Sequence, residues 1–335
     1  MRVGLALPHY DFSLPGGGPI TFARVAEVAR TAERLGFDSV WASDHFFASL
    51  ERYGGGPEPQ GSLEPLTTLA ALAPLTERVR LGTLVLSAGF RHPAVLAKSA
   101  TAIDLLSGGR LDLGVGAGWF EPEYRAFGYP FGPLDEHFRI LEETLEVLGR
   151  LFAGGPASYR GERYTLREAY NHPSPAQSPR PPIWVGGKGG PRSLRLIARL
   201  ADGWNTVWRW TPESYAERVE AARAACERAG RDPATLRLSL GLFTVLGTDE
   251  ADLERRYATI AERLPAGVAA QMPLQTLRRE GLAGTPGQAL ERLAAFAELG
   301  VEELIVSPAL IWFALPDPSM LDLLAEALVP GAHDL

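Results

Sequence analysis

The chain has 335 residues, 46% of them hydrophobic, and a formal net charge of −7 at pH 7. This excess of negative charge argues against binding to nucleic acid or to an anionic membrane surface. The single cysteine, Cys226, excludes an intrachain disulfide and a cysteine-rich metal site, and we expect no metal centre. The first residues are too poor in apolar side chains for a signal peptide and no segment reaches transmembrane length, so we expect a cytoplasmic protein.

Eight short apolar segments recur along the chain, and their nearly continuous hydrophobicity is typical of parallel strands buried on both faces. These segments are 2–8, 39–42, 80–86, 111–115, 182–186, 203–207, 236–246 and 303–306. Segments with helical spacing separate them, at 22–35, 93–106, 135–151, 193–200, 212–229, 286–299 and 318–328. Eight alternations of strand and helix indicate an α/β fold, a (β/α)₈ TIM barrel, more readily than an open doubly wound sheet.

The chain is longer than the roughly 250 residues of a bare barrel, so we expect insertions in its loops. Residues 154–181 follow the fourth helix and contain a segment that predicts a small hairpin. Residues 248–284 follow the seventh strand and predict additional helices. No change in composition divides the chain, and we predict a single domain over residues 1–335.

The loop after the second strand carries two adjacent polar residues, Asp44 and His45. In a barrel of this kind the chemistry lies on the loops that follow the strands. Asp44 could accept a hydrogen bond from a ligand N–H, and His45 could transfer protons near neutral pH. The alternative is an aspartate that closes a turn beside a histidine bonded to the main chain. For Arg91 and His92, after the third strand, we expect a structural role toward loop carbonyls.

The fourth strand ends in a glycine-rich turn, Gly116-Ala117-Gly118, which leaves room for a ligand to approach the backbone. Trp119 and Phe120 follow it, and together with Phe46 and Phe47 they could form the wall of a pocket. Glu123 is a second candidate for proton transfer, although it could equally cap the helical turn that follows.

The fifth strand leads into four glycines, Gly186, Gly187, Gly189 and Gly190, with Lys188 among them and Arg192 just beyond. Exposed backbone N–H groups, a helix N-terminus and two cations together favour phosphate binding. The spacing is not that of a nucleoside triphosphate loop. The alternative is a flexible turn between strand and helix.

Four sequence blocks together resemble the bacterial luciferase-like flavin oxidoreductase superfamily, specifically its branch that depends on the deazaflavin coenzyme F-420 (F420). The blocks are GFDSVWASDHF, the long segment VRLGTLVLSAGF to GWFEPEYRAFG, PPIWVGGKGGPRSLRLIARLADGWN, and GTPGQALERLAAFAELGVEELIV. The resemblance implies a TIM barrel that binds a flavin-like cofactor at the carboxyl ends of its strands. It also implies that the cofactor phosphate lies at the loop Gly186 to Gly190.

The resemblance implies further roles, position by position. Asp44 and His45 match an Asp-His pair beside the deazaflavin ring. Leu84 and Val85 fall where the family has a bulge with a non-proline cis peptide behind the ring, and Ser87 falls where a hydroxyl reaches the pyrimidine edge. We expect Gly116, Gly118 and Trp119 to border the cofactor as well.

The resemblance implies hydride transfer between reduced F420 and a small organic substrate, with His45 as proton donor or acceptor. Sugar-phosphate dehydrogenases of this superfamily carry a glutamate at the position of Trp119, so a sugar phosphate is not the expected substrate. Alternatives are a two-component monooxygenase that uses reduced FMN and dioxygen, a non-catalytic flavin-binding protein, and an aldolase-type barrel. The last is disfavoured because no lysine stands at a strand end where it could form a Schiff base.

For the oligomeric state, we expect a homodimer.

Overall fold

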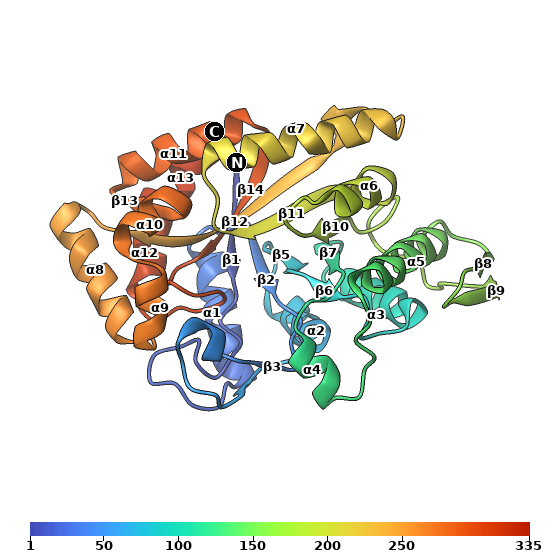
Figure 1. The fold of residues 1–335 in the computed structure, drawn as a ribbon, viewed down its shortest axis with the longest axis horizontal. Helices are drawn as coiled ribbons and strands as arrows, with labels where there is room; N and C mark the ends of the chain where they lie inside the picture. Colours follow the sequence, from blue (N-terminus) through green and yellow to red (C-terminus); the bar gives the residue numbers. More distant parts are fainter.

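Eight parallel strands close into a barrel in the computed structural model, which describes residues 1–335 (Figure 1). In barrel order the strands are β1 (Arg2–Ala6), β2 (Ser39–Ala42), β5 (Arg80–Thr83), β7 (Leu111–Gly116), β10 (Ile183–Gly186), β11 (Gly203–Trp208), β12 (Arg237–Leu246) and β14 (Val301–Ser307). Pairing of β14 with β1 completes the ring, so these strands leave no open edge. Each strand neighbours the next barrel strand in the chain, and the predicted (β/α)₈ barrel is confirmed.

Helices cover the outside of the barrel. They are α1 (Phe22–Arg34), α2 (Pro65–Leu72), α3 (Pro93–Leu106), α5 (Leu134–Phe152), α6 (Pro191–Leu200), α7 (Pro212–Arg228), α11 (Pro286–Glu298), α12 (Ser319–Ala327) and α13 (Val329–His333). Most predicted elements agree with these bounds within two residues. Helix α2 was not predicted, because its sequence PLTTLAAL has no charged face from which a helical period can be recognised. None of the helices combines the length and the apolar character that crossing a membrane requires.

The third barrel strand is interrupted, contrary to the continuous segment 80–86 predicted from hydrophobicity. Strand β5 ends at Thr83, a cis peptide joins Leu84 to Val85, and β6 (Leu86–Ser87) then pairs with β7. The bulge that the family resemblance implied is therefore confirmed. A second non-proline cis peptide, between Val207 and Trp208, was not foreseen.

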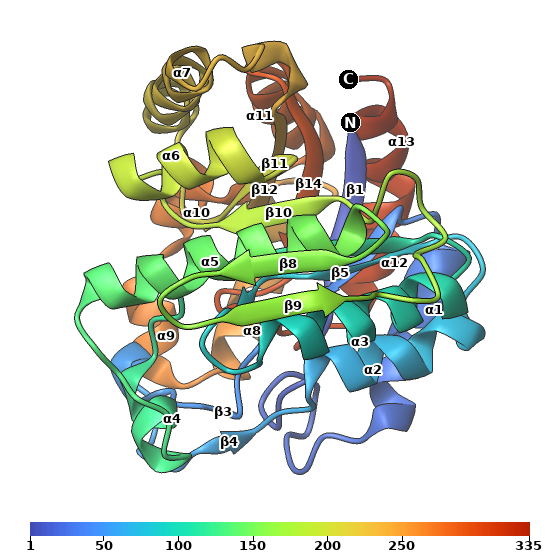
Figure 2. The same cartoon turned by 90° about the vertical axis from the view of Figure 1, so that its right-hand side faces the viewer.

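Both predicted insertions are present. Strands β8 (Ala157–Arg160) and β9 (Thr165–Ala169) form the hairpin, which lies along α5 on the outside of the molecule (Figure 2). The second insertion contains α8 (Glu250–Glu262), α9 (Ala266–Gln271), α10 (Leu274–Glu280) and β13 (Leu282–Gly284), a short strand that pairs with β12.

A fully buried carboxylate, Glu303, lies inside the amino-terminal end of the barrel. It accepts hydrogen bonds from the Ser39 hydroxyl at 2.5 Å, from the Trp41 indole N–H at 3.2 Å and from the Arg2 guanidinium at 2.6 Å. Burial raises the pKa of Glu303. A buried charge is tolerated only when it is paired and hydrogen-bonded, so this network fixes three strands relative to one another.

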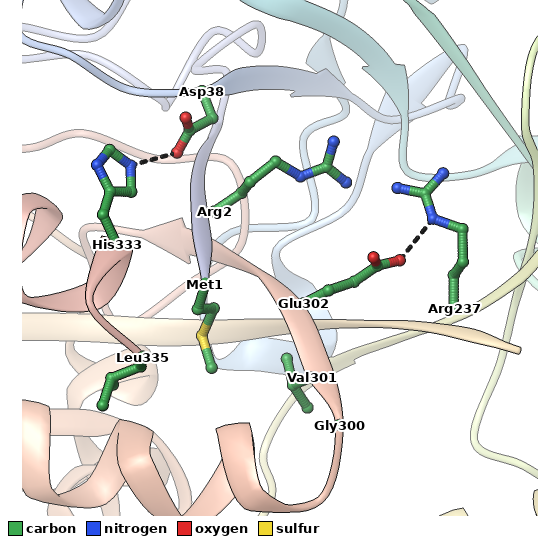
Figure 3. A pocket seen from close by; sticks show the side chains of 9 residues that line it. All are labelled: Met1, Arg2, Asp38, Arg237, Gly300, Val301, Glu302, His333 and Leu335. Atoms are coloured by element: carbon green, nitrogen blue, oxygen red, sulfur yellow. Dashed lines mark hydrogen bonds and ion pairs between the residues drawn. The ribbon is translucent and has the colours of Figure 1, made fainter. Parts of the chain in front are cut away.

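A hollow of about 700 Å³ opens at the same end of the barrel, next to both chain termini (Figure 3). Two ion pairs line it, between Glu302 and Arg237 at 2.6 Å and between His333 and Asp38 at 2.8 Å. Active sites in barrels of this kind lie at the opposite end, on the loops that follow the strands. We therefore assign the hollow to the packing of the termini.

Glu303→Ala should lower the free energy of unfolding by about 3 kcal/mol or more, because Ser39, Trp41 and Arg2 lose their buried acceptor. The neighbouring Glu302→Ala is the matched control, since its ion pair is partly exposed and should contribute less than about 1 kcal/mol. Urea unfolding followed by circular dichroism measures both values. Equal losses for the two variants would show that the buried network has no special stabilising role.

Candidate active site at the carboxyl ends of the strands

The loops that follow the barrel strands gather at the end of the molecule opposite the termini (Figures 1 and 2). The loop after β2 contains β3 (Phe47–Ala48), the short helix η1 (Glu51–Tyr53) and β4 (Gln60–Gly61). The loop after β7 contains α4 (Glu121–Ala126). Together with the loops after β5, β10 and β14, these segments bring most of the predicted site residues to one end of the barrel.

His45 and Glu123, the two candidates for proton transfer, are hydrogen-bonded to each other. The Nδ1 atom of His45 lies 2.8 Å from Oε1 of Glu123, and the backbone N–H of Phe46 donates to Oε2 at 2.9 Å. A carboxylate only accepts hydrogen bonds, so Nδ1 carries the proton and Nε2 remains for a ligand. The Glu123 side chain is 2% exposed and that of His45 16% exposed. Glu123 does not cap α4, because its carboxylate bonds to the loop after β2.

Asp44 joins two loops rather than standing free. Its carboxylate forms a double ion pair with Arg91, at 2.6 and 2.9 Å, and accepts the backbone N–H of Ser87 at 2.9 Å. Arg91 also binds Glu64 at 2.5 Å, so it contacts carboxylates and not the carbonyls that were expected. His92 is structural as expected, but its ring contacts no carbonyl: it caps α3 by accepting the backbone N–H of Ala94 at 3.2 Å.

The turn after β7 requires glycine at position 118. Gly118 has a φ of +79°, and a Cβ there would lie 2.0 Å from the Tyr124 hydroxyl and 2.6 Å from the Ser87 hydroxyl. These two hydroxyls are hydrogen-bonded to each other, and burial raises the pKa of Tyr124 to about 12. The Ser87 hydroxyl is thereby held in one place at the edge of the site.

Val85, from the cis bulge, contacts two other glycines of the site. A Cβ on Gly116 would lie 2.8 Å from a Val85 methyl group, and one on Gly186 would lie 2.6 Å from it. Glycine at both positions lets Val85 pack between β7 and β10 at the carboxyl end of the barrel.

The glycine-rich loop after β10 leads directly into α6, whose first residue follows Gly190. No side chain caps this helix, and a Cβ added at Gly187 or Gly190 would meet no atom within 4 Å. The first backbone N–H groups of a helix have no partner within the helix, and an anion can bind there. The open space and the uncapped helix fit the phosphate of a flavin-like cofactor.

The two cations of this loop have partners within the protein. The Lys188 ammonium donates to the Val207 carbonyl and lies 4.7 Å from the centre of the Trp210 ring, and burial lowers its pKa to about 8. Arg192 forms an ion pair with Asp135 on the surface. The anion-binding character of the loop therefore rests first on its backbone.

Aromatic rings surround the imidazole of His45. The ring centres of Trp119, Phe120 and Trp312 lie 5.8, 6.0 and 6.2 Å from its centre. The sequence indicated the first two, but it did not indicate Trp312, which follows β14. The only signal was a pair of aromatic residues, Trp312 and Phe313, after the last strand. No group of three or more His, Cys, Asp or Glu side chains is placed to hold a metal ion.

Comparisons with known proteins agree with this architecture. A sequence profile described as luciferase-like monooxygenase matches residues 1–303. An F420-dependent glucose-6-phosphate dehydrogenase of Microbacterium testaceum (strain StLB037) is 30% identical over 291 residues, which cover 82% of this chain and 84% of that protein. An F420-dependent hydroxymycolic acid dehydrogenase of Mycobacterium tuberculosis is 33% identical over 250 residues, which cover 74% of this chain and 64% of that protein. Among solved structures, the monooxygenase RslO1 of Streptomyces bottropensis superposes with a TM-score of 0.77 at 26% identity over the full length of both chains.

Proposed function

Because the chain belongs to the luciferase-like monooxygenase family, we propose that it is an oxidoreductase that transfers a hydride between coenzyme F420 and a small organic substrate. The observation that carries this proposal is the His45–Glu123 pair, which stands at the same end of the barrel as an open, glycine-rich loop. The names of both dehydrogenase relatives support the choice of F420.

The residues that would hold the coenzyme come from four loops, those after β2, β5, β7 and β10. We assign its phosphate to the backbone of Gly186, Gly187, Gly189 and Gly190, with Lys188 and Arg192 beside them. The remaining residues that we assign to the coenzyme would contact its ring, and they are Asp44, Leu84, Val85, Ser87, Gly116, Gly118 and Trp119. When bound in its reduced form, the coenzyme supplies a hydride, with two electrons, to a substrate carbonyl carbon.

In its protonated form His45 supplies the matching proton from Nε2 to the carbonyl oxygen and returns to the neutral imidazole with its remaining proton on Nδ1, so that a ketone becomes a secondary alcohol. Glu123 accepts the hydrogen bond of Nδ1, which keeps the imidazole in one orientation and stabilises it when it is protonated. The surrounding rings of Trp119, Phe120 and Trp312 would limit the access of water to the reacting atoms.

A monooxygenase that uses reduced FMN and dioxygen is the second candidate, and the likeness to RslO1 favours it. Both cofactors carry a phosphate that the glycine loop would accept. A non-catalytic flavin-binding protein is less well supported. Such a protein transfers no proton, so it would not require the His45–Glu123 pair, in which the His45 side chain is 16% exposed.

Glucose 6-phosphate is not proposed as the substrate of this chain, because Trp119 stands where the family resemblance implies a glutamate in the sugar-phosphate dehydrogenases. The homodimer remains a proposal, supported by Leu75, Val95, Leu105 and Leu106, exposed apolar residues on or beside helices α2 and α3. The cytoplasmic location remains a prediction.

F420 should bind at least tenfold more tightly than FMN, a difference of about 1.4 kcal/mol. Parallel fluorescence titrations of the purified protein with both cofactors measure the two affinities. Tighter binding of FMN, with flavin-dependent oxygen consumption in the presence of a reductase, would assign the protein to the monooxygenase reaction.

Gly190→Asp should weaken F420 binding at least tenfold without lowering the thermal midpoint of unfolding. The backbone of Gly190 is extended and unobstructed, and aspartate at this position would cap α6 with its own carboxylate and so repel a phosphate. Gly190→Ala is the control and should keep the affinity within about threefold. Unchanged F420 affinity in the aspartate variant would show that the phosphate does not bind at this loop.

His45→Ala should lower turnover by about 10²–10⁴, the range for the loss of a general acid or base, and leave the F420 affinity within a few-fold. Reduction of a panel of ketones and enones by reduced F420 gives the rate. His92→Ala, a histidine that caps a helix, is the control. If His45→Ala weakened cofactor binding strongly but preserved the rate at saturating F420, His45 would be a contact of the coenzyme ring and Glu123 the next candidate for proton transfer.

A further inference from the structure

We infer that this site takes neutral carbonyl compounds with a hydrocarbon portion, and that Trp119 is the residue that selects them. This inference rests on the proposed function and names its substrate class. Five aromatic side chains carry it, and we call them the aromatic wall: Phe47, Trp119, Phe120, Phe127 and Trp312.

The aromatic wall is continuous from the surface to the catalytic imidazole. Phe127 lies 6.4 Å from Phe47, Phe47 lies 5.8 Å from Phe120, and Phe120 lies 5.3 Å from Trp119, measured between ring centres. The edge-to-face contact of Trp119 with His45, at 5.8 Å, then brings the wall to the proton donor. The wall therefore provides a run of aromatic surface that ends at His45.

Two members of the wall are left largely uncovered. Trp119 is 52% exposed and Phe127 is 54% exposed, although both stand among other aromatic rings. Large apolar side chains that remain exposed at the two ends of one aromatic cluster are typical of a binding site. Rings of this size contribute to the free energy of binding mainly by removing apolar surface from water, which favours a ligand with a hydrocarbon portion.

Charge near His45 disfavours an anionic substrate. Three carboxylates, those of Asp44, Glu64 and Glu123, are paired with one guanidinium, that of Arg91, and with the imidazole of His45, so one negative charge remains even when His45 is protonated. The Arg91 cation is itself occupied by two of these carboxylates, so it is not available to a phosphate or carboxylate of the substrate. The residual negative charge would repel such groups.

One cation lies on the open side of the wall. The guanidinium of Arg52 is 5.8 Å from the centre of the Trp119 ring, in a cation–π contact. The indole of Trp119 therefore lies between this guanidinium and the imidazole of His45, which it contacts at a steep interplanar angle of 82°. The same guanidinium could bind the anionic group of a substrate. The experiment below therefore distinguishes an Arg52 that orients Trp119 from an Arg52 that binds an anion.

The test compares 2-octanone with 7-oxooctanoate, two methyl ketones of equal chain length of which only the second carries a carboxylate. Calorimetry measures the Kd of each probe, with and without oxidised F420, and steady-state assays with reduced F420 measure kcat and KM. We expect 2-octanone to bind at least tenfold more tightly than 7-oxooctanoate and to be reduced with the higher kcat/KM.

Because Trp119 is also assigned to the border of the coenzyme ring, its variants are compared without F420 and at saturating F420. Trp119→Ala should raise the Kd for 2-octanone about tenfold in both states and raise KM to a similar extent, whereas Trp119→Phe should keep most of the affinity. Tyr170→Ala is the matched control, because this tyrosine is 57% exposed on the insertion far from His45 in the chain and should change none of these values. Thermal midpoints establish that each variant is folded.

Two results would overturn the inference: tighter binding of 7-oxooctanoate that Arg52→Ala abolishes, or a Kd for 2-octanone that Trp119→Ala leaves unchanged. Failure of the proposed function looks different. If F420 does not bind but the cofactor-free protein still binds 2-octanone in a manner that depends on Trp119, the coenzyme assignment fails and the substrate class stands.

Discussion

A carboxylate that is buried must have all of its strong hydrogen bonds supplied by the protein, and at the carboxyl end of this barrel that constraint applies twice. Asp44 satisfies it with Arg91 and the backbone of Ser87, and Glu123 satisfies it with His45 and the backbone of Phe46. These bonds connect the loops after β2, β5 and β7. The position of the His45 imidazole therefore depends on the hydrogen bonds that connect these three loops, and not only on the short segment that contains His45.

The floor of the site depends on the absence of side chains. Gly116 and Gly186 have no Cβ where Val85 approaches, and Gly118 has none where the Ser87 and Tyr124 hydroxyls meet. Alanine at Gly118 would combine an unfavourable backbone conformation with a steric overlap. The bulge, the glycine turn and the hydroxyl pair therefore form one packed unit beneath the place assigned to the coenzyme ring.

The barrel could be predicted from sequence because buried parallel strands and amphipathic helices have characteristic periods. Helix α2 was not predicted, because an apolar helix without a charged face shows no such period in its sequence. The site was predicted less completely. Sequence spacing gave His45 and Glu123 as separate candidates, since a hydrogen bond between distant positions has no local signal. Trp312 was missed for the same reason, and nothing in the sequence around Val207 and Trp208 indicates their cis peptide.

The environment of Lys188 has a consequence for chemical labelling. The chain contains two lysines, Lys98 on the outside of the barrel and Lys188 at its carboxyl end, beneath the Trp210 ring. An ordinary lysine is almost entirely protonated at pH 8, whereas burial lowers the pKa of Lys188 to about 8, so a larger share of its amine is neutral there. Only the neutral amine is nucleophilic. At mildly alkaline pH, an acylating reagent should therefore react with Lys188 faster than with Lys98. The reaction would place a spectroscopic reporter at the carboxyl end of the barrel.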